Sequence, residues 1–323
     1  LGSKIAAKQI AQGAGVPITP GYFEPNATHG ELENAAKAIG YPVMLKASAG
    51  GGGRGMRVVR GPEDFRRELE IASNEAQSAF GEGAMMIEKL IARPRHVEAQ
   101  LLADSHGSIA VLFERECSLQ RRHQKLIEES PSPAFALHPD GWSKMLEAAA
   151  SLAHATGYQN AGTVEFLMDD AGELYFMEVN ARLQVEHPVI ELVTGVDLVK
   201  WQLRIAQGEP LRLDEGLMHG ERSALRGHAI EARIIAEDPA RGFLPSLGRI
   251  RAWAEPRMPG VRVDTACRAG SEVTRHYDSL LAKVISRGET REEAIARLPD
   301  DMREVVTMVK LEGMLLDEVA SVL

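Results

Sequence analysis

The segment from residue 178 to residue 186 reads EVNARLQVE and carries a chemically capable side chain at every second position. In an extended strand these side chains leave one face, while the apolar residues between them leave the other. Such a face could bind a divalent cation at one end and an oxyanion in the middle, and it could supply a base at the other end. The alternative is a half-buried strand with a solvated outer face. The five polar positions are Glu178, Asn180, Arg182, Gln184 and Glu186.

Two apolar runs precede this segment and are separated by Asp-Asp-Ala-Gly at positions 169–172. This pattern predicts a β-hairpin with the glycine at the turn. Glu165 lies in the first run and Glu178 in the second, so we expect them to face each other directly or diagonally. Two acids in an apolar wall need compensation, and Mg²⁺ is commonly held by one or two carboxylates together with substrate phosphates. The hairpin therefore predicts a magnesium site.

A glycine-rich stretch could bind those phosphates. Residues 43–59 read VMLKASAGGGGRGMRVV, in which an apolar run carrying Lys46 leads through five glycines and Arg54 into a second apolar run. Glycine permits positive φ and close backbone approach, so the N–H groups of such a loop can contact phosphate oxygens. The stretch is neither a Walker A loop nor a dinucleotide fingerprint. The alternative is a plain hairpin tip.

Composition sets wider bounds. The chain has 323 residues, 44% of them hydrophobic, which suits two or three globular domains. Its net charge of −9 argues against nucleic acid as a partner. Cys117 and Cys267 are far apart and lack metal or redox spacing. The sequence shows neither a transmembrane run nor a signal peptide, so we expect no membrane association and an intracellular protein, cytoplasmic or, in a eukaryote, in the mitochondrial matrix.

Long ordered motifs give the chain a resemblance to a known family. The stretches LKASAGGGGRGMRVV, MIEKLIARPRHVEAQLLAD, ERECSLQRRHQKLIEESP, FMEVNARLQVEHPVIELVTGVDLVKWQLRIAQGEPL and RGHAIEARIIAEDPARGFLPSLGRI closely resemble the biotin carboxylases of the ATP-grasp superfamily. The resemblance extends over nearly the whole chain. It implies an α+β fold, with an ATP-grasp lid and an antiparallel-sheet body followed by a strand-rich C-terminal domain.

The implied division comprises an N-terminal helix (1–17), a lid (18–90), a body with the metal and bicarbonate site (91–220) and the C-terminal domain (221–323). Family members begin with a further α/β domain of about a hundred residues, and this sequence starts just past it, so we expect either that the sequence is a fragment or that the domain is a separate chain. The tail MREVVTMVKLEGMLLDEVASVL does not keep the ending expected of the family, in which a glycine and an asparagine punctuate the last two helices.

The resemblance assigns site residues one by one. It implies ATP contacts by Lys4, Lys46, the lid glycines Gly51, Gly52 and Gly53, the hinge Glu88, Lys89 and Leu90, and the pocket residues His96, Gln120, His123 and Leu167. It implies metal binding by Glu165, Glu178 and Asn180. Bicarbonate would contact Lys125, Arg182, Gln184 and Val185. Glu186 would be the general base, and Arg233 would face the ureido oxygen of biotin. Without the resemblance, Lys4 could be a surface lysine, and Arg233 could simply pair with Glu231 or Glu237.

The implied reaction is a carboxylation in two stages, using ATP, Mg²⁺ (or Mn²⁺) and bicarbonate, with biotin as the carried substrate. The chain lacks the Met-Lys-Met signature of a carrier domain, so we expect biotin on a carrier domain or protein, together with a carboxyltransferase subunit and homo-oligomeric assembly. The segment around Trp201 favours the α component of an acyl-CoA carboxylase. Two alternatives are another ATP-grasp carboxyl-activating ligase, such as carbamoyl-phosphate synthetase, and a catalytically silent nucleotide-binding or assembly module.

Overall fold

The computed structural model describes residues 3–49 and 55–310. The lid glycines Gly51, Gly52 and Gly53 and the segment 311–323 therefore lie outside the described residues. The first helix, α1 (Lys4–Gly13), confirms the helix expected within residues 1–17. Its N-cap is Ser3, whose hydroxyl accepts a hydrogen bond from the amide of Ala6.

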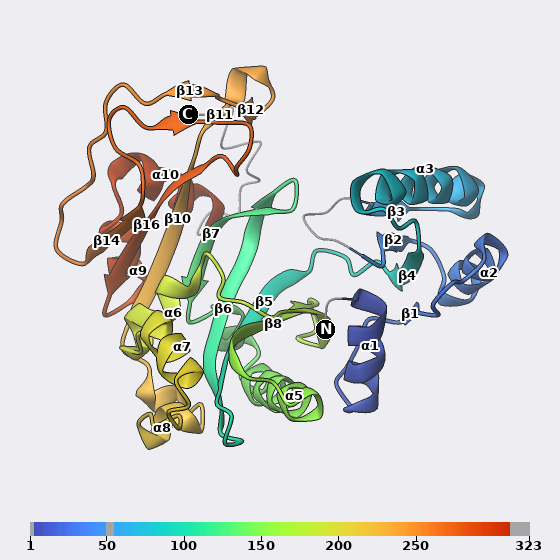
Figure 1. Cartoon of the computed structure of the whole chain (residues 1–323), viewed down its shortest axis with the longest axis horizontal. Helices are drawn as coiled ribbons and strands as arrows, with labels where there is room; N and C mark the ends of the chain where they lie inside the picture. Colours follow the sequence, from blue (N-terminus) through green and yellow to red (C-terminus); the bar gives the residue numbers. More distant parts are fainter. Residues whose placement is uncertain (1–2, 50–54, 311–323) are drawn as a thin grey trace.

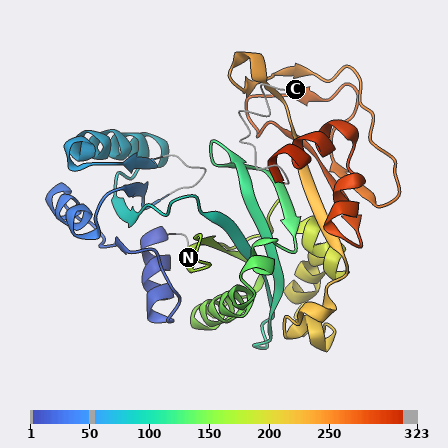
Figure 2. The same ribbon diagram turned by 180° about the vertical axis from the view of Figure 1, so that it is seen from behind.

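A small antiparallel sheet with two helices follows α1. Its strand order is β1-β4-β2-β3, and its apolar core lies between the sheet and the helices. In α3 (Pro62–Phe80), Pro62 occupies the first turn and Gly81 ends the helix in the left-handed region. The elements are β1 (Gly21–Tyr22), α2 (His29–Ile39), β2 (Val43–Ala47), β3 (Arg57–Val59), α3 (Pro62–Phe80) and β4 (Met85–Lys89). They lie to one side of the molecule, and α1 lies between them and the larger sheet (Figures 1 and 2).

An eight-stranded antiparallel sheet forms the rest of the frame, in the order β14-β16-β10-β7-β6-β5-β8-β9. Its first strands are β5 (Arg95–Ala103), β6 (Ile109–Arg121), β7 (Gln124–Ser130), β8 (Asn160–Met168) and β9 (Leu174–Asn180). The later strands are β10 (His228–Ile235), β14 (Val261–Thr265) and β16 (Leu280–Gly288). Because β10 pairs with β7, strands from residues 221–323 extend the same sheet that residues 91–220 begin.

Helices cover the large sheet. The main core packs α5 and α6 against it, and a smaller cluster packs α9 and α10 against β10 and β16 from the face seen in Figure 2. These helices are α4 (Ala134–Leu137), α5 (Asp140–Thr156), α6 (His187–Thr194), α7 (Leu198–Ala206), α8 (Glu215–Met218), α9 (Arg291–Ala296) and α10 (Asp300–Lys310). The remaining short elements are η1 (Arg222–Ala224), β11 (Glu237–Asp238), η2 (Pro239–Arg241), β12 (Leu244–Pro245), β13 (Gly248–Arg249) and β15 (Glu272–Val273). Every described helix is too short or too polar to cross a membrane.

The prediction of a strand over residues 178–186 is wrong beyond Asn180. Strand β9 ends at Asn180, the chain continues without regular structure, and Glu186 is already the N-cap of α6. Burial there no longer alternates as predicted, because Ala181 is exposed whereas Gln184 is buried. The five polar side chains nevertheless line one cavity, so the loop achieves the convergence that the sequence pattern suggested.

Candidate active site

The two acids of the hairpin lie directly opposite each other. Strands β8 and β9 pair Glu165 with Glu178, and the turn between them includes Gly172 at φ +83°. The carboxylate of Glu165 contacts His96 Nε2 at 2.9 Å and accepts a hydrogen bond from Asn180 Nδ2 at 2.9 Å. Within the described part of the chain, the carboxylate of Glu178 makes neither a hydrogen bond nor an ion pair, although its backbone belongs to the sheet.

The pKa values of the two acids move in opposite directions. Burial, and then the charge of Glu165, raise the pKa of Glu178. Burial also opposes ionisation of Glu165, but the charges of Lys125 and His96 outweigh it and lower the pKa of that carboxyl. An uncompensated carboxylate beside an ionised one is an oxygen-rich place for a divalent cation, since the cation would remove the repulsion. The side chains of Glu165, Glu178 and Asn180 therefore fit a magnesium site.

Lys125 is the centre of the adjoining charge network. Its ammonium donates to Glu186 Oε1 at 2.6 Å, to Glu98 Oε2 at 2.5 Å and to Glu165 Oε1 at 3.1 Å. Gln184 Oε1 accepts a further bond at 3.2 Å. Burial would lower the pKa of Lys125, but the surrounding carboxylates raise it well above its usual range. The network thus holds a fixed positive charge beside the acid pair.

Glu186 lies between two cations. Its other oxygen accepts a bond from Arg233 Nη2 at 2.9 Å, and only 1% of the side chain is exposed. Arg233 also donates through Nε to Glu128 Oε1 at 2.6 Å. The alternative in which Arg233 pairs with Glu231 or Glu237 is therefore wrong: Arg233 pairs with Glu128 and Glu186, and Glu237 pairs with Arg121.

Two further predicted bicarbonate contacts border the same space. Arg182 is exposed, and its Nη2 lies 3.4 Å from Asn180 Oδ1. The carbonyl of Val185 accepts a hydrogen bond from Lys283 Nζ at 2.7 Å, which fixes the loop before α6. Together with Lys4, the acid pair, Lys125, Gln184, Glu186 and Arg233, these residues line a cavity of about 400 Å³.

A second cavity of about 280 Å³ adjoins it, between the small sheet and the large one. It is lined by the residues that the resemblance assigns to the nucleotide, namely Lys46, Glu88, Lys89, Leu90, His96, Gln120, His123 and Leu167. His96, Gln120 and His123 line both cavities, so a ligand in one would reach the other. Gln120 also fixes the imidazole, because its Nε2 lies 2.7 Å from His96 Nδ1.

The resemblance assigned Glu88 to the hinge that contacts ATP, but its carboxylate is bound by two lysines. Its carboxylate is 2% exposed and pairs with Lys46 and with Lys8, the latter at 2.6 Å. Although burial opposes ionisation, these two lysines hold the pKa of Glu88 below its ordinary value. The side chain therefore anchors Lys46 and Lys8, while its neighbours Lys89 and Leu90 line the cavity.

Sequence reasoning missed four charged residues of this site: Lys8, Glu98, Arg115 and Glu128. Arg115 is fully buried and donates to Glu98 Oε1 at 2.5 Å, which holds that acid beneath Lys125. A signal was present for Glu98, because His96, Glu98 and Gln100 alternate along one strand in the same way as the polar residues after position 178.

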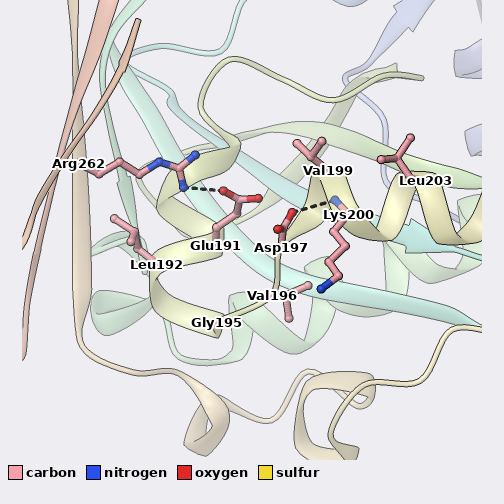
Figure 3. A pocket seen from close by; sticks show the side chains of 9 residues that line it. All are labelled: Glu191, Leu192, Gly195, Val196, Asp197, Val199, Lys200, Leu203 and Arg262. Carbon is pink, nitrogen blue, oxygen red and sulfur yellow. Dashed lines mark hydrogen bonds and ion pairs between the residues drawn. The ribbon is translucent and has the colours of Figure 1, made fainter.

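A third cavity, of about 600 Å³, lies away from this chemistry on the surface of α6 and α7 (Figure 3). Three of its charged side chains have partners: Arg262 Nη1 donates to Glu191 Oε2 at 2.7 Å, and Asp197 accepts a hydrogen bond from the backbone amide of Lys200 at the start of α7. Much of the remaining lining is aliphatic. Both carboxylates of this cavity, Glu191 and Asp197, already accept hydrogen bonds, whereas the acid pair of Glu165 and Glu178 faces the smaller cavities, so we take those as the candidate active site.

Comparison with known proteins gives matches along nearly the whole chain. The family model described as carbamoyl-phosphate synthase L chain, ATP binding domain matches residues 3–214, and the model described as biotin carboxylase C-terminal domain matches residues 231–319. A biotin carboxylase of Nostoc sp. is 51% identical over 94% of this chain and 66% of its own length. The mitochondrial methylcrotonoyl-CoA carboxylase subunit alpha of Mus musculus is 48% identical over 92% of this chain and 41% of its own length.

A solved structure agrees in three dimensions. The biotin carboxylase domain dimer of Hydrogenobacter thermophilus 2-oxoglutarate carboxylase, in complex with MgADP, ADP and bicarbonate, superimposes with a TM-score of 0.87 at 47% identity. The match covers 92% of this chain and 64% of that one. The chain thus spans less than two thirds of the length of these relatives.

Proposed function

The chain belongs to the biotin carboxylase family, and from this premise we propose that it carboxylates biotin with bicarbonate at the expense of ATP. The α+β ATP-grasp fold expected from the sequence is confirmed by the superposition. The observation that carries the proposal is Glu186, a buried carboxylate fixed between Lys125 and Arg233 and lining the same cavity as the acid pair.

We assign nucleotide binding to the cavity of about 280 Å³ between the two sheets. We place the adenine side at Lys89 and Leu90, and the phosphates toward Lys46 and Lys4, whose ammonium groups supply positive charge. Burial lowers the pKa of Lys4, partly offset by the charge of Glu178. A bound polyphosphate would favour the charged form of this lysine.

The metal would be held by Glu165 and Glu178, with Asn180 beside them. Bound there, Mg²⁺ would neutralise phosphate charge during phosphoryl transfer. The chain's own residues contribute mainly position and charge, as is usual for this class of reaction.

We assign bicarbonate activation to the cavity of about 400 Å³ that Glu186 lines. Lys125 and the exposed Arg182 would orient the anion, and Glu186 would accept its proton as it attacks the γ-phosphate. Bicarbonate would replace part of the present coordination of Lys125, which the carboxylates now fill. The product of this step is carboxyphosphate.

Carboxylation of biotin completes the cycle. Carboxyphosphate would release CO₂ and phosphate, the phosphate would remove the proton from the ureido nitrogen, and this nitrogen would then form the N–C bond to CO₂ that gives carboxybiotin. Arg233, held by Glu128 and Glu186, would stabilise the negative oxygen that develops on the ureido group. Water exclusion is aided by the closed packing around Glu186, which is almost fully buried.

The assembly follows from the relatives. They include components of larger biotin-dependent carboxylases, so we propose a biotin carrier and a carboxyltransferase as partners. Because the Hydrogenobacter domain is described as a dimer, we also propose homo-oligomerisation, which light scattering on the purified protein would test.

The test of the function is ATP hydrolysis with MgATP and bicarbonate, measured with and without free biotin. A biotin carboxylase releases ADP only with bicarbonate, and biotin raises the rate. Formation of carbamoyl phosphate when ammonia is supplied would identify the other ligase class instead. Tight nucleotide binding without turnover would identify a silent module and contradict the proposal.

A further inference from the structure

Two buried acids lie near Arg233, and neither takes part in a chemical step of the proposed reaction. Glu128 on β7 and Glu231 on β10 are direct partners in the antiparallel register, and both are 0% exposed. Directly opposite residues have Cβ atoms about 4.5–5.5 Å apart, which brings two carboxyl groups together.

Their hydrogen bonding is incomplete within the described part of the chain. Neither oxygen of Glu231 has a partner, and Oε2 of Glu128 has none, while Oε1 of Glu128 accepts from Arg233. Three unpartnered oxygens in a buried pair are costly when both groups are ionised. One proton on Glu231, donated to Glu128 Oε2, would satisfy two of them and remove the repulsion.

We propose that Glu128 and Glu231 form a carboxylate–carboxylic acid pair sharing one proton, and that this pair positions Arg233 for its contact with biotin. The proton resides on Glu231, because Arg233 binds Glu128 and favours its ionised form. Positioning by the pair rests on the proposed function, whereas the shared proton does not.

The surrounding charges agree with this assignment. Glu231 is faced by Glu128 from β7, by Glu186 from the loop before α6, by Arg233 on its own strand and by Lys283 from β16. Lys283 bonds the carbonyl of Val185 at 2.7 Å and lies 3.3 Å from Asp264. Burial, reinforced by the charge of Glu128, raises the pKa of Glu231 well above its usual range. Burial also raises the pKa of Glu128, against the influence of Arg233 and, more weakly, Lys125.

The charge of the pair matters because Arg233 is shared. With one proton present, Arg233 contacts two carboxylates, Glu128 and Glu186, in a fixed geometry. Loss of the proton would place a third negative charge nearby. That negative charge would draw the Arg233 guanidinium away from bound biotin. The attraction between the guanidinium and the ureido oxyanion would then be weaker.

Infrared spectroscopy tests the proton directly, without any activity. At neutral pH the wild-type protein should show the carbonyl stretch of a buried carboxylic acid, and Glu231→Gln should remove this band. Glu129→Gln is the matched control, since Glu129 is the next residue on β7 but is paired with Arg291 and His228. Absence of the band from the wild type at neutral pH, or its survival in Glu231→Gln, would overturn the proposal even if a variant folded poorly.

Kinetics test the positioning role. In the wild type, biotin-stimulated turnover should fall about tenfold per pH unit once the shared proton is lost at alkaline pH. Glu231→Gln, which keeps an uncharged donor, should move that alkaline limb upward by more than one pH unit. Glu128→Gln should lower biotin-stimulated turnover at least tenfold while leaving the KM for ATP unchanged. An unmoved alkaline limb in Glu231→Gln, or a matching loss of ATP affinity in Glu128→Gln, would refute the positioning role.

Discussion

Replacing Glu186 with glutamine tests the centre of the proposed chemistry. The substitution keeps the shape of a side chain that is 1% exposed but removes the group that accepts the proton of bicarbonate. Loss of a positioned general base typically costs about 10²–10⁴-fold in rate, which is about 2.7–5.4 kcal/mol of transition-state stabilisation. We expect bicarbonate-dependent ATP cleavage to fall by this factor.

The same geometry sets a bound on the structural effect. The carboxylate now accepts from Lys125 at 2.6 Å and from Arg233 at 2.9 Å, and a carboxamide can accept from only one of them. One charge-assisted hydrogen bond is worth about 1.5–3 kcal/mol. Unfolding by urea should therefore show a loss of about that size, and the fold should persist.

The assay separates chemistry from binding. ADP release is measured with saturating MgATP while bicarbonate is varied, and nucleotide affinity is measured by calorimetry. Glu191→Gln is the matched control, since it removes an arginine-bound carboxylate on α6, 2.7 Å from Arg262, outside both active-site cavities. Retained turnover in Glu186→Gln, or a collapse of nucleotide affinity with it, would refute the role of Glu186 as base.

Three further predictions concern the metal, the phosphates and the buried pair. Glu178→Gln should raise the Mg²⁺ concentration for half-maximal activity at least tenfold, about 1.4 kcal/mol, with little change in stability; an unaltered Mg²⁺ titration would contradict the metal site. Lys4→Met should raise the KM for ATP about tenfold without altering the KM for biotin, because a cation beside the phosphates is lost; equal effects on both substrates would contradict this placement. Because folding raises the pKa of Glu231, this group binds its proton more tightly in the native state than in the unfolded chain, and above about pH 4.5 its contribution to stability should fall by up to about 1.4 kcal/mol per pH unit as pH rises. Urea unfolding at pH 5.5 and 8 should show a smaller fall for Glu231→Gln; an identical fall would show that Glu231 is not the group that titrates.

The local elements and the family could be predicted from the sequence. Period-two alternation and the Asp-Asp-Ala-Gly turn predicted the hairpin of β8 and β9, because side chains alternate across a strand whatever lies around it. The polar residues at 178–186 were correctly predicted to converge, although the strand assumed for them ends at Asn180.

The ion pairs of the site could not be predicted from the sequence, because they depend on the tertiary fold. Lys125 contacts acids from β5, β8 and the loop before α6, and Arg233 on β10 reaches Glu128 and Glu186. These partners lie tens of residues apart in sequence, so strand order and register, not local spacing, bring them together. The unpartnered oxygens of Glu231 are likewise a product of register, since the pairing of β10 with β7 places one acid opposite another in an interior that water does not reach.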